Sequence, residues 1–124
     1  MSERPSGITL QAIVEQAHKT SVAHGWWSSD EDTIPAKLLL IHSEVSEAVE
    51  AYCKPLEGTW NGKPLSLTQP YLGYHPEGFV VELADIIIRV ADIAGYLGLD
   101  LTEAMLAKLE YNKTRPARHG GKRI

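Results

Sequence analysis

Cysteine, aromatic residues and long apolar runs are all scarce in this sequence of 124 residues. The one cysteine, Cys53, excludes an internal disulfide framework and suits a reducing cytoplasm, where we expect it to be a packing residue. The longest apolar region, residues 79–99, is interrupted by four charged side chains, which excludes a membrane span. The N-terminus also lacks the basic and then apolar layout of a signal peptide.

Convincing strand patterns are missing too, whereas apolar residues recur often at helical spacing. This spacing predicts helices over about residues 8–22, 35–52, 76–97 and 100–112. Asp32 or Thr33 is expected to cap the second helix, and Asp100 with Glu103 the fourth. We therefore expect an all-α bundle of about four main helices, formed by a single domain over residues 1–124 with a loose N-terminus at 1–7.

Proline and glycine are concentrated in residues 55–78, which hold four of the seven prolines and four of the ten glycines. The segment is expected to be a long loop, and such loops in small domains are usually functional or mobile. A β-hairpin across Asn61 and Gly62 is the alternative, although few β-branched residues flank that pair.

Charge is unevenly distributed. Net charge is −4, yet six of the 12 basic residues lie at or after Lys108, against one acid there, Glu110. Residues 114–124 are therefore expected to form an irregular basic tail on an acidic body. Such a tail favours an anionic partner without saying which one.

The third expected helix carries a narrow acidic stripe. Between residues 79 and 94 the only charged or polar side chains are Glu82, Asp85, Arg89 and Asp92, and they fall within an arc of about 80°. A helix that is otherwise apolar is expected to be buried nearly all round, so its charges need compensation. For Asp92, an ion pair with Arg89 is favoured over metal binding.

The second expected helix carries a similar acidic pair, Glu44 and Glu47, which lie three residues apart on one face. Its expected core positions are Leu38, Ile41, Val45, Ala48, Val49 and Tyr52. If the two helices pack antiparallel, both acid pairs converge, and bound divalent cations would relieve their repulsion. Oxygen-only ligands favour Mg²⁺, with Mn²⁺ as a substitute, over a di-iron site, which pairs Glu with His. One such pair alone is most often a solvated helix face; two in consecutive helices favour a metal site.

At these residues the chain resembles the MazG-type all-α nucleoside triphosphate pyrophosphohydrolases. Their signature is an ExxE pair on one helix followed by ExxD on the next, read here as Glu44-Val45-Ser46-Glu47 and Glu82-Leu83-Ala84-Asp85. The stretch from Gly98 through Arg115-Pro116 is similar to the same family. The resemblance implies metal-dependent hydrolysis of a nucleoside triphosphate to its monophosphate and pyrophosphate. It also implies a homodimer or homotetramer in which neighbouring subunits complete each site.

Roles for individual residues follow as expectations. The metal ligands would be Glu44, Glu47, Glu82 and Asp85, with Glu47 or another of these carboxylates as general base. Substrate-binding candidates on or after the last helix are Lys108, Asn112, Arg115, Arg118 and Lys122, whose alternative is an ordinary solvated tail. Trp27 and His24 could stack a base, or the tryptophans could pack the end of the first helix.

Two other functions remain open. The chain could be a non-catalytic helical dimer that acts as an interaction or regulatory module, or an all-α hydrolase of a different phosphate compound. Specific nucleic-acid binding is not expected, because net charge is negative and no recognition-helix pattern is present. No membrane partner is expected either.

Overall fold

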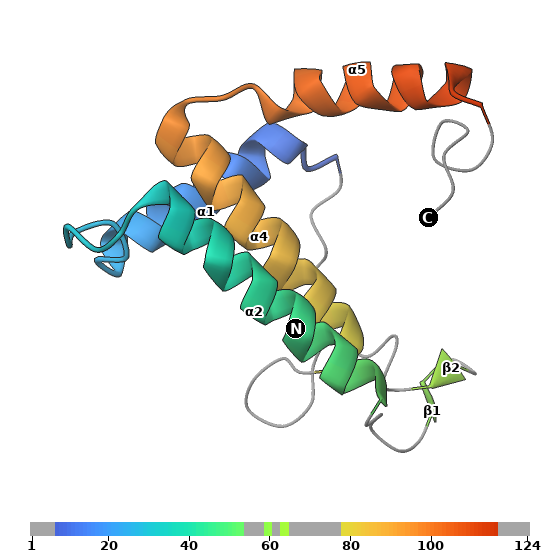
Figure 1. The fold of residues 1–124 in the computed structure, drawn as a ribbon, viewed down its shortest axis with the longest axis horizontal. Helices are drawn as coiled ribbons and strands as arrows, with labels where there is room; N and C mark the ends of the chain where they lie inside the picture. Colours follow the sequence, from blue (N-terminus) through green and yellow to red (C-terminus); the bar gives the residue numbers. More distant parts are fainter. Residues whose placement is uncertain (1–6, 54–58, 61–62, 65–77, 117–124) are drawn as a thin grey trace.

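The computed structural model describes residues 7–53, 59–60, 63–64 and 78–116 (Figure 1). Its helices are α1 (Leu10–Ala23), α2 (Ile34–Cys53), α4 (Phe79–Leu97) and α5 (Leu101–Thr114). The all-α prediction is confirmed. The start expected for the third helix, at residue 76, falls outside the described residues; α4 itself begins at Phe79, after Gly78.

A short hairpin lies between α2 and α4. Strands β1 (Thr59–Trp60) and β2 (Lys63–Pro64) pair antiparallel, with Thr59 opposite Pro64 and Trp60 opposite Lys63. This pairing agrees with the hairpin that the sequence left open as the alternative to a long loop, and it leaves the all-α class unchanged. The other residues of the expected loop lie outside the described part.

Side-chain caps set the starts of three helices, as their sequences indicate. Thr9 accepts a hydrogen bond from the Ala12 amide at 3.0 Å, and Thr33 accepts one from the Ala36 amide at 3.3 Å. Asp100 accepts one from the Glu103 amide at 2.9 Å. Each bond satisfies an N–H group that has no partner within its own helix.

Helix α4 lies between α1 and α2, running antiparallel to α2, whereas α1 crosses it (Figure 1). The end of α2 meets the start of α4 where Tyr52 contacts Phe79, with ring centroids 5.3 Å apart. Helices α1 and α4 approach closely at Gly95, where an added Cβ would lie 2.6 Å from the Cβ of His18. Helix α5 packs on α1 near its own start and then projects away from the other helices.

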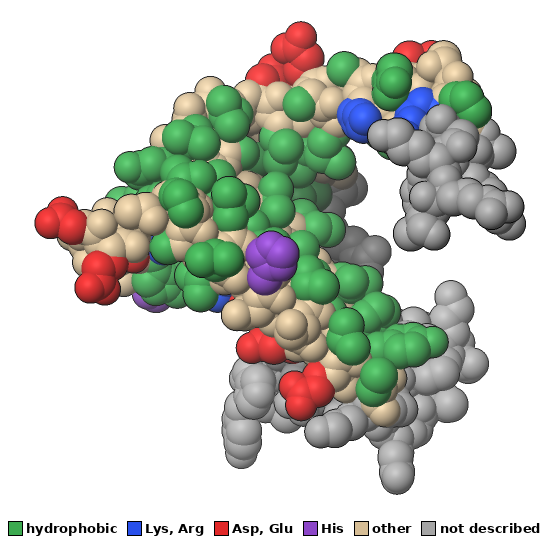
Figure 2. Space-filling model, in the orientation of Figure 1, with side chains coloured by type: hydrophobic (Ala, Val, Ile, Leu, Met, Phe, Trp, Pro, Cys, Tyr) green, Lys and Arg blue, Asp and Glu red, His purple; other side chains and the backbone are tan. Residues whose placement is uncertain are grey.

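The buried core is small. Val14, Ala91 and Ala94 form its centre, and partly buried apolar residues of α1 and α5 pack around them. The remaining apolar faces are open, and Figure 2 shows hydrophobic side chains spread over α2 and α4 and along α5. Exposed positions include Leu38, Val45, Val49, Tyr52, Leu83, Ile87, Ile88, Leu106 and Leu109.

Three expectations about burial therefore do not hold within the single chain. Helix α4 is not buried all round, because only α1 and α2 pack extensively against it. Most of the core positions expected on α2 are exposed for the same reason, and Ala48 is the one that is fully buried. Cys53 is exposed and is not a packing residue. Among the described helices, none combines the length and apolar character needed to cross a bilayer.

A candidate metal-binding carboxylate cluster

Three of the four predicted acidic ligands converge between α2 and α4. One carboxylate oxygen from each of Glu44, Glu47 and Glu82 lies within 4.8 Å of the others. The convergence follows from the antiparallel packing, which sets the middle of α2 against the first half of α4. Asp85 lies one turn beyond Glu82 on α4, beside this group but outside that distance. We call these four residues the carboxylate cluster.

The members of the carboxylate cluster differ in exposure. Glu44 is buried, with 8% of its surface exposed, whereas Glu47 is exposed and Glu82 and Asp85 are intermediate. The Oε2 atom of Glu82 is buried and has no hydrogen-bond partner. Burying an unpaired carboxylate oxygen costs free energy, so a cation bound at Glu82 would stabilise the folded protein.

Mutual repulsion raises the affinity of the cluster for protons. The charge of Glu44 and a hydrogen bond with it raise the pKa of Glu47 above its usual 4.5. Burial and the charge of Asp85 raise the pKa of Glu82, and burial with the charge of Glu44 raises the pKa of Asp85 above 3.8. Anything positive that enters the cluster, a proton or a metal ion, is therefore stabilised.

Arg89 is the basic side chain that the cluster already contains. Its Nε donates a hydrogen bond to Oε1 of Glu44 at 2.8 Å, joining α4 to α2. The guanidinium charge partly offsets the effects of the acids on Glu47 and Asp85. The predicted ion pair between Arg89 and Asp92 was wrong, because packing against α2 brings the longer arginine side chain to Glu44 instead.

Asp92 belongs to a separate buried network that joins α1, α4 and the loop after α1. It accepts hydrogen bonds from Nε1 of Trp27 at 3.0 and 3.2 Å, and Nδ1 of His18 lies 2.9 Å from its Oδ1. Trp27 also stacks on Tyr96 with centroids 3.8 Å apart, and the Lys37 ammonium lies 4.8 Å from its ring centroid. The indole of Trp27 is thus packed within the chain. His24 instead stacks on Trp26.

A cavity of about 120 Å³ adjoins the carboxylate cluster. It is lined by Ala17, Ser21, Trp26, Asp85, Ile88, Arg89 and Asp92, so it shares Asp85 and Arg89 with the cluster region. The hydroxyl of Ser21 is buried and unpartnered, with 1% of the residue exposed. Sequence patterns did not indicate Ser21, since a serine in the last turn of a helix carries no signal until the neighbouring helix is in place.

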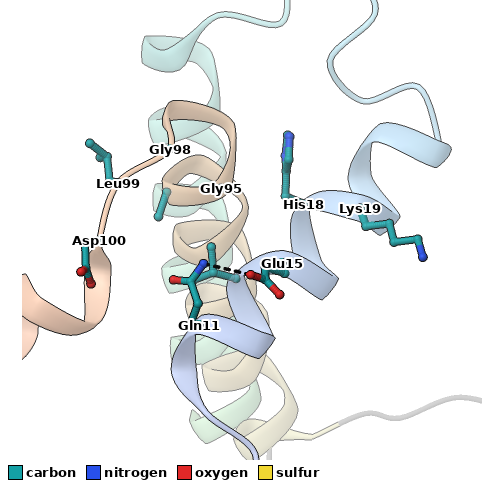
Figure 3. A pocket seen from close by; sticks show the side chains of 10 residues that line it. Gln11, Glu15, His18, Lys19, Gly95, Gly98, Leu99 and Asp100 are labelled. Carbon is teal, nitrogen blue, oxygen red and sulfur yellow. Dashed lines mark hydrogen bonds between the residues drawn. The ribbon is translucent and has the colours of Figure 1, made fainter.

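A larger groove of about 470 Å³ lies between α1 and the turn that joins α4 to α5 (Figure 3). Gln11 and Glu15 hydrogen-bond to each other on its α1 side at 3.3 Å, and Asp100 lies on the opposite side. None of the four cluster carboxylates lines this groove. This groove is therefore not the candidate metal site, although it is larger than the cavity beside Asp85.

The predicted substrate-binding residues of α5 are not brought to the cluster within one chain. Lys108, Asn112 and Arg115 lie on or directly after the exposed projecting helix, where Lys108 and Arg115 contact the ring of Tyr111. Arg118 and Lys122 lie outside the described residues.

The donor atoms of the carboxylate cluster suit a hard divalent cation. Its carboxylate oxygens are the ligands that Mg²⁺ and Mn²⁺ prefer, and the unpartnered oxygen of Glu82 is available to one. Glu44, Glu47 and Glu82 would hold the ion, with Asp85 beside them. Comparisons of this chain with protein-family models, with curated proteins and with solved structures returned no match.

Proposed function

We propose that this chain is a metal-dependent nucleoside triphosphate pyrophosphohydrolase of the MazG type, which releases a nucleoside monophosphate and pyrophosphate. Its role would be to remove unwanted nucleotides from the cellular pool. The convergence of Glu44, Glu47 and Glu82 between two antiparallel helices carries the proposal. Magnesium held by a few carboxylates normally completes its coordination with water and substrate phosphates, which connects such a cluster to phosphate chemistry.

The residues of the cluster suit distinct roles. A bound Mg²⁺ would neutralise phosphate charge and lower the pKa of the attacking water. Glu47 is the exposed member of the cluster, which gives it the best access to a water directed at the α-phosphorus, and its raised pKa suits a proton acceptor. Buried Glu44 would hold the ion from the α2 side, together with Glu47.

The cavity next to Asp85 supports a position for the rest of the substrate. Trp26 offers an aromatic wall, and Ser21 offers a buried hydroxyl without a partner. A group with a flat face and hydrogen-bonding edges, such as a nucleobase, would satisfy both. His24, stacked on Trp26, would extend the aromatic surface.

The proposal includes a homo-oligomer, a dimer or tetramer. Within one chain, large apolar side chains of α2 and α4 such as Leu39, Val49 and Ile87 are exposed. Exposed apolar patches of this kind are typical of protein interaction faces. A second copy would cover the open apolar faces of α2 and α4, and its α5 would bring Lys108, Asn112 and Arg115 toward a cluster whose own base, Arg89, is paired with Glu44.

The test is incubation with a panel of ribo- and deoxyribonucleoside triphosphates and Mg²⁺, followed by detection of monophosphate and pyrophosphate. Activity should be lost in excess chelator and in the Glu44→Gln and Asp85→Asn variants, while circular dichroism shows the fold retained. The exposed acid Glu110 provides the control, since Glu110→Gln should keep full turnover. Full turnover in chelator would refute the metal-dependent reaction. No turnover with any nucleotide, together with a stable dimer, would favour the non-catalytic interaction module.

A further inference from the structure

Arg89 is bonded to a carboxylate that is also a candidate metal ligand. Its guanidinium reaches from α4 to the buried carboxylate of Glu44, on which the Nε hydrogen bond of 2.8 Å ends. Glu44 is also one of the three residues whose oxygens converge within 4.8 Å. The same carboxylate is therefore the arginine's partner and a candidate metal ligand.

Arg89 lies on the acidic stripe of α4 itself. Positions 82, 85 and 89 are three and four residues apart, so their side chains share one side of the helix. Among the described residues, Arg89 is the only lysine or arginine recorded in an ion pair with a member of the carboxylate cluster. Without it, buried Glu44 would face Glu47 and Glu82 with no counter-charge, which is a costly arrangement.

A divalent cation and the guanidinium are poorly compatible on one buried carboxylate. Both are positive, and the buried Glu44 carboxylate that they would share is poorly screened by solvent. Arg89 has space to leave toward solvent: its side chain is 38% exposed, so withdrawal from Glu44 does not require the helices to separate.

We propose that Arg89 is the built-in counter-cation of the metal-free site, and that a divalent ion binds by displacing its guanidinium from Glu44. This rests on the proposed metal site. Arg89 thereby keeps the empty site folded and at the same time lowers its affinity for metal. It is a positioning residue that acts through Glu44.

Two measurements on Arg89→Met test the competition. This variant replaces the arginine with an apolar side chain of similar length and so removes the charge. Calorimetric titration with Mn²⁺, without nucleotide, should show about tenfold tighter binding than wild type, because the competing cation is gone. The melting temperature in chelator should fall, because Glu44 is left buried without a partner. Lys113→Met is the matched control: it removes an exposed base paired with Glu110 on α5 and should change neither value.

A second variant and the resonance of the Arg89 Nε–H group keep the proposal testable if Arg89→Met fails to fold. Arg89→Lys keeps the charge but loses the planar Nε donor, so its Mn²⁺ affinity should lie between those of wild type and Arg89→Met. In isotope-labelled wild-type protein, the Arg89 Nε–H resonance should exchange slowly in chelator and be lost on titration with Mg²⁺.

The outcomes separate this proposal from the proposed function. If wild type binds Mn²⁺ and Arg89→Met binds it equally well or more weakly, Arg89 is only a structural ion pair and the proposal is wrong. If wild-type protein binds no Mn²⁺ at all, the metal site fails and both proposals fall. Tighter binding by Arg89→Met in a protein without nucleotide hydrolysis would support the competition and refute the enzyme.

Discussion

At the scale of single residues, the carboxylates of the cluster repel one another, and they differ in whether a partner offsets that repulsion. Glu44 has Arg89 as a partner, whereas Asp85 forms no ion pair recorded among the described residues and Glu82 keeps one buried oxygen unpaired. Neutralising different members of the cluster should therefore have opposite effects on the stability of the metal-free protein.

Asp85→Asn should stabilise the protein in chelator. Burial and the charge of Glu44 both oppose ionisation of Asp85, so an uncharged side chain of the same shape removes repulsion. The gain should be small, about 0.5 kcal/mol, because solvent screens a carboxylate that is only partly buried. Thermal melts of wild type and variant in chelator measure it. A lower melting temperature for Asp85→Asn would mean that this carboxylate is held by a favourable pair after all.

The raised pKa of Glu82 predicts a pH dependence of the metal-free protein. The folded state binds the proton more tightly than the unfolded chain, whose Glu pKa is 4.5. This contribution destabilises the fold above the raised pKa and is relieved as pH falls through that pKa toward 4.5.

Denaturant unfolding in chelator, at about pH 7.5 and about pH 5.5, should therefore show a gain in stability on acidification that is smaller in Glu82→Gln. The difference between wild type and variant isolates Glu82 from the other titrating groups. Equal pH dependence in both proteins would contradict a raised pKa at this position.

At the scale of helices, the contact of α1 with α4 depends on the absence of a side chain at position 95. A Cβ there would lie 2.6 Å from the Cβ of His18 and 3.3 Å from the carbonyl oxygen of Val14. Gly95→Ala should destabilise the protein by about 2 kcal/mol, because the helices must separate. Helix propensity alone would give the opposite sign, a gain of up to about 1 kcal/mol. Urea unfolding decides between them, and a stabilised variant would refute the close approach.

The basic tail is the other element with a testable role. The body of the molecule is acidic, and a triphosphate adds more negative charge than bound metal alone would offset. Truncation after Pro116 removes Arg118 and Lys122 and should raise KM for the triphosphate while leaving the melting temperature nearly unchanged. The salt dependence of binding should weaken as well. An unchanged KM would identify the tail as an ordinary solvated terminus.

At the scale of the whole molecule, the four helices of one chain leave extensive apolar surface open on α2, α4 and α5. If a second copy covers it, the melting temperature should rise with protein concentration, because association stabilises only the folded form. Sedimentation should give at least a dimer, and nucleotide hydrolysis should fall on dilution below the dissociation constant. A monomer that melts at the same temperature at every concentration would rule out self-association.

The sequence by itself determined the local features. Apolar spacing predicted all four helices to within a few residues, and the capping roles of Thr33 and Asp100 were readable because they depend on neighbours three residues away. The i,i+3 acid pairs likewise follow from helical periodicity, which places each pair on one face whatever the rest of the chain does.

Only the tertiary structure decided which side chains meet across helices. The offset between α2 and α4 places Arg89 against Glu44. The packing of α1 places Asp92 against Trp27 and His18. Neither pairing has a local signature, because a shift of one turn would exchange the partners without changing any helix. Burial was misjudged for a related reason: an apolar pattern records that a face avoids water, but not whether the chain's own helices cover it.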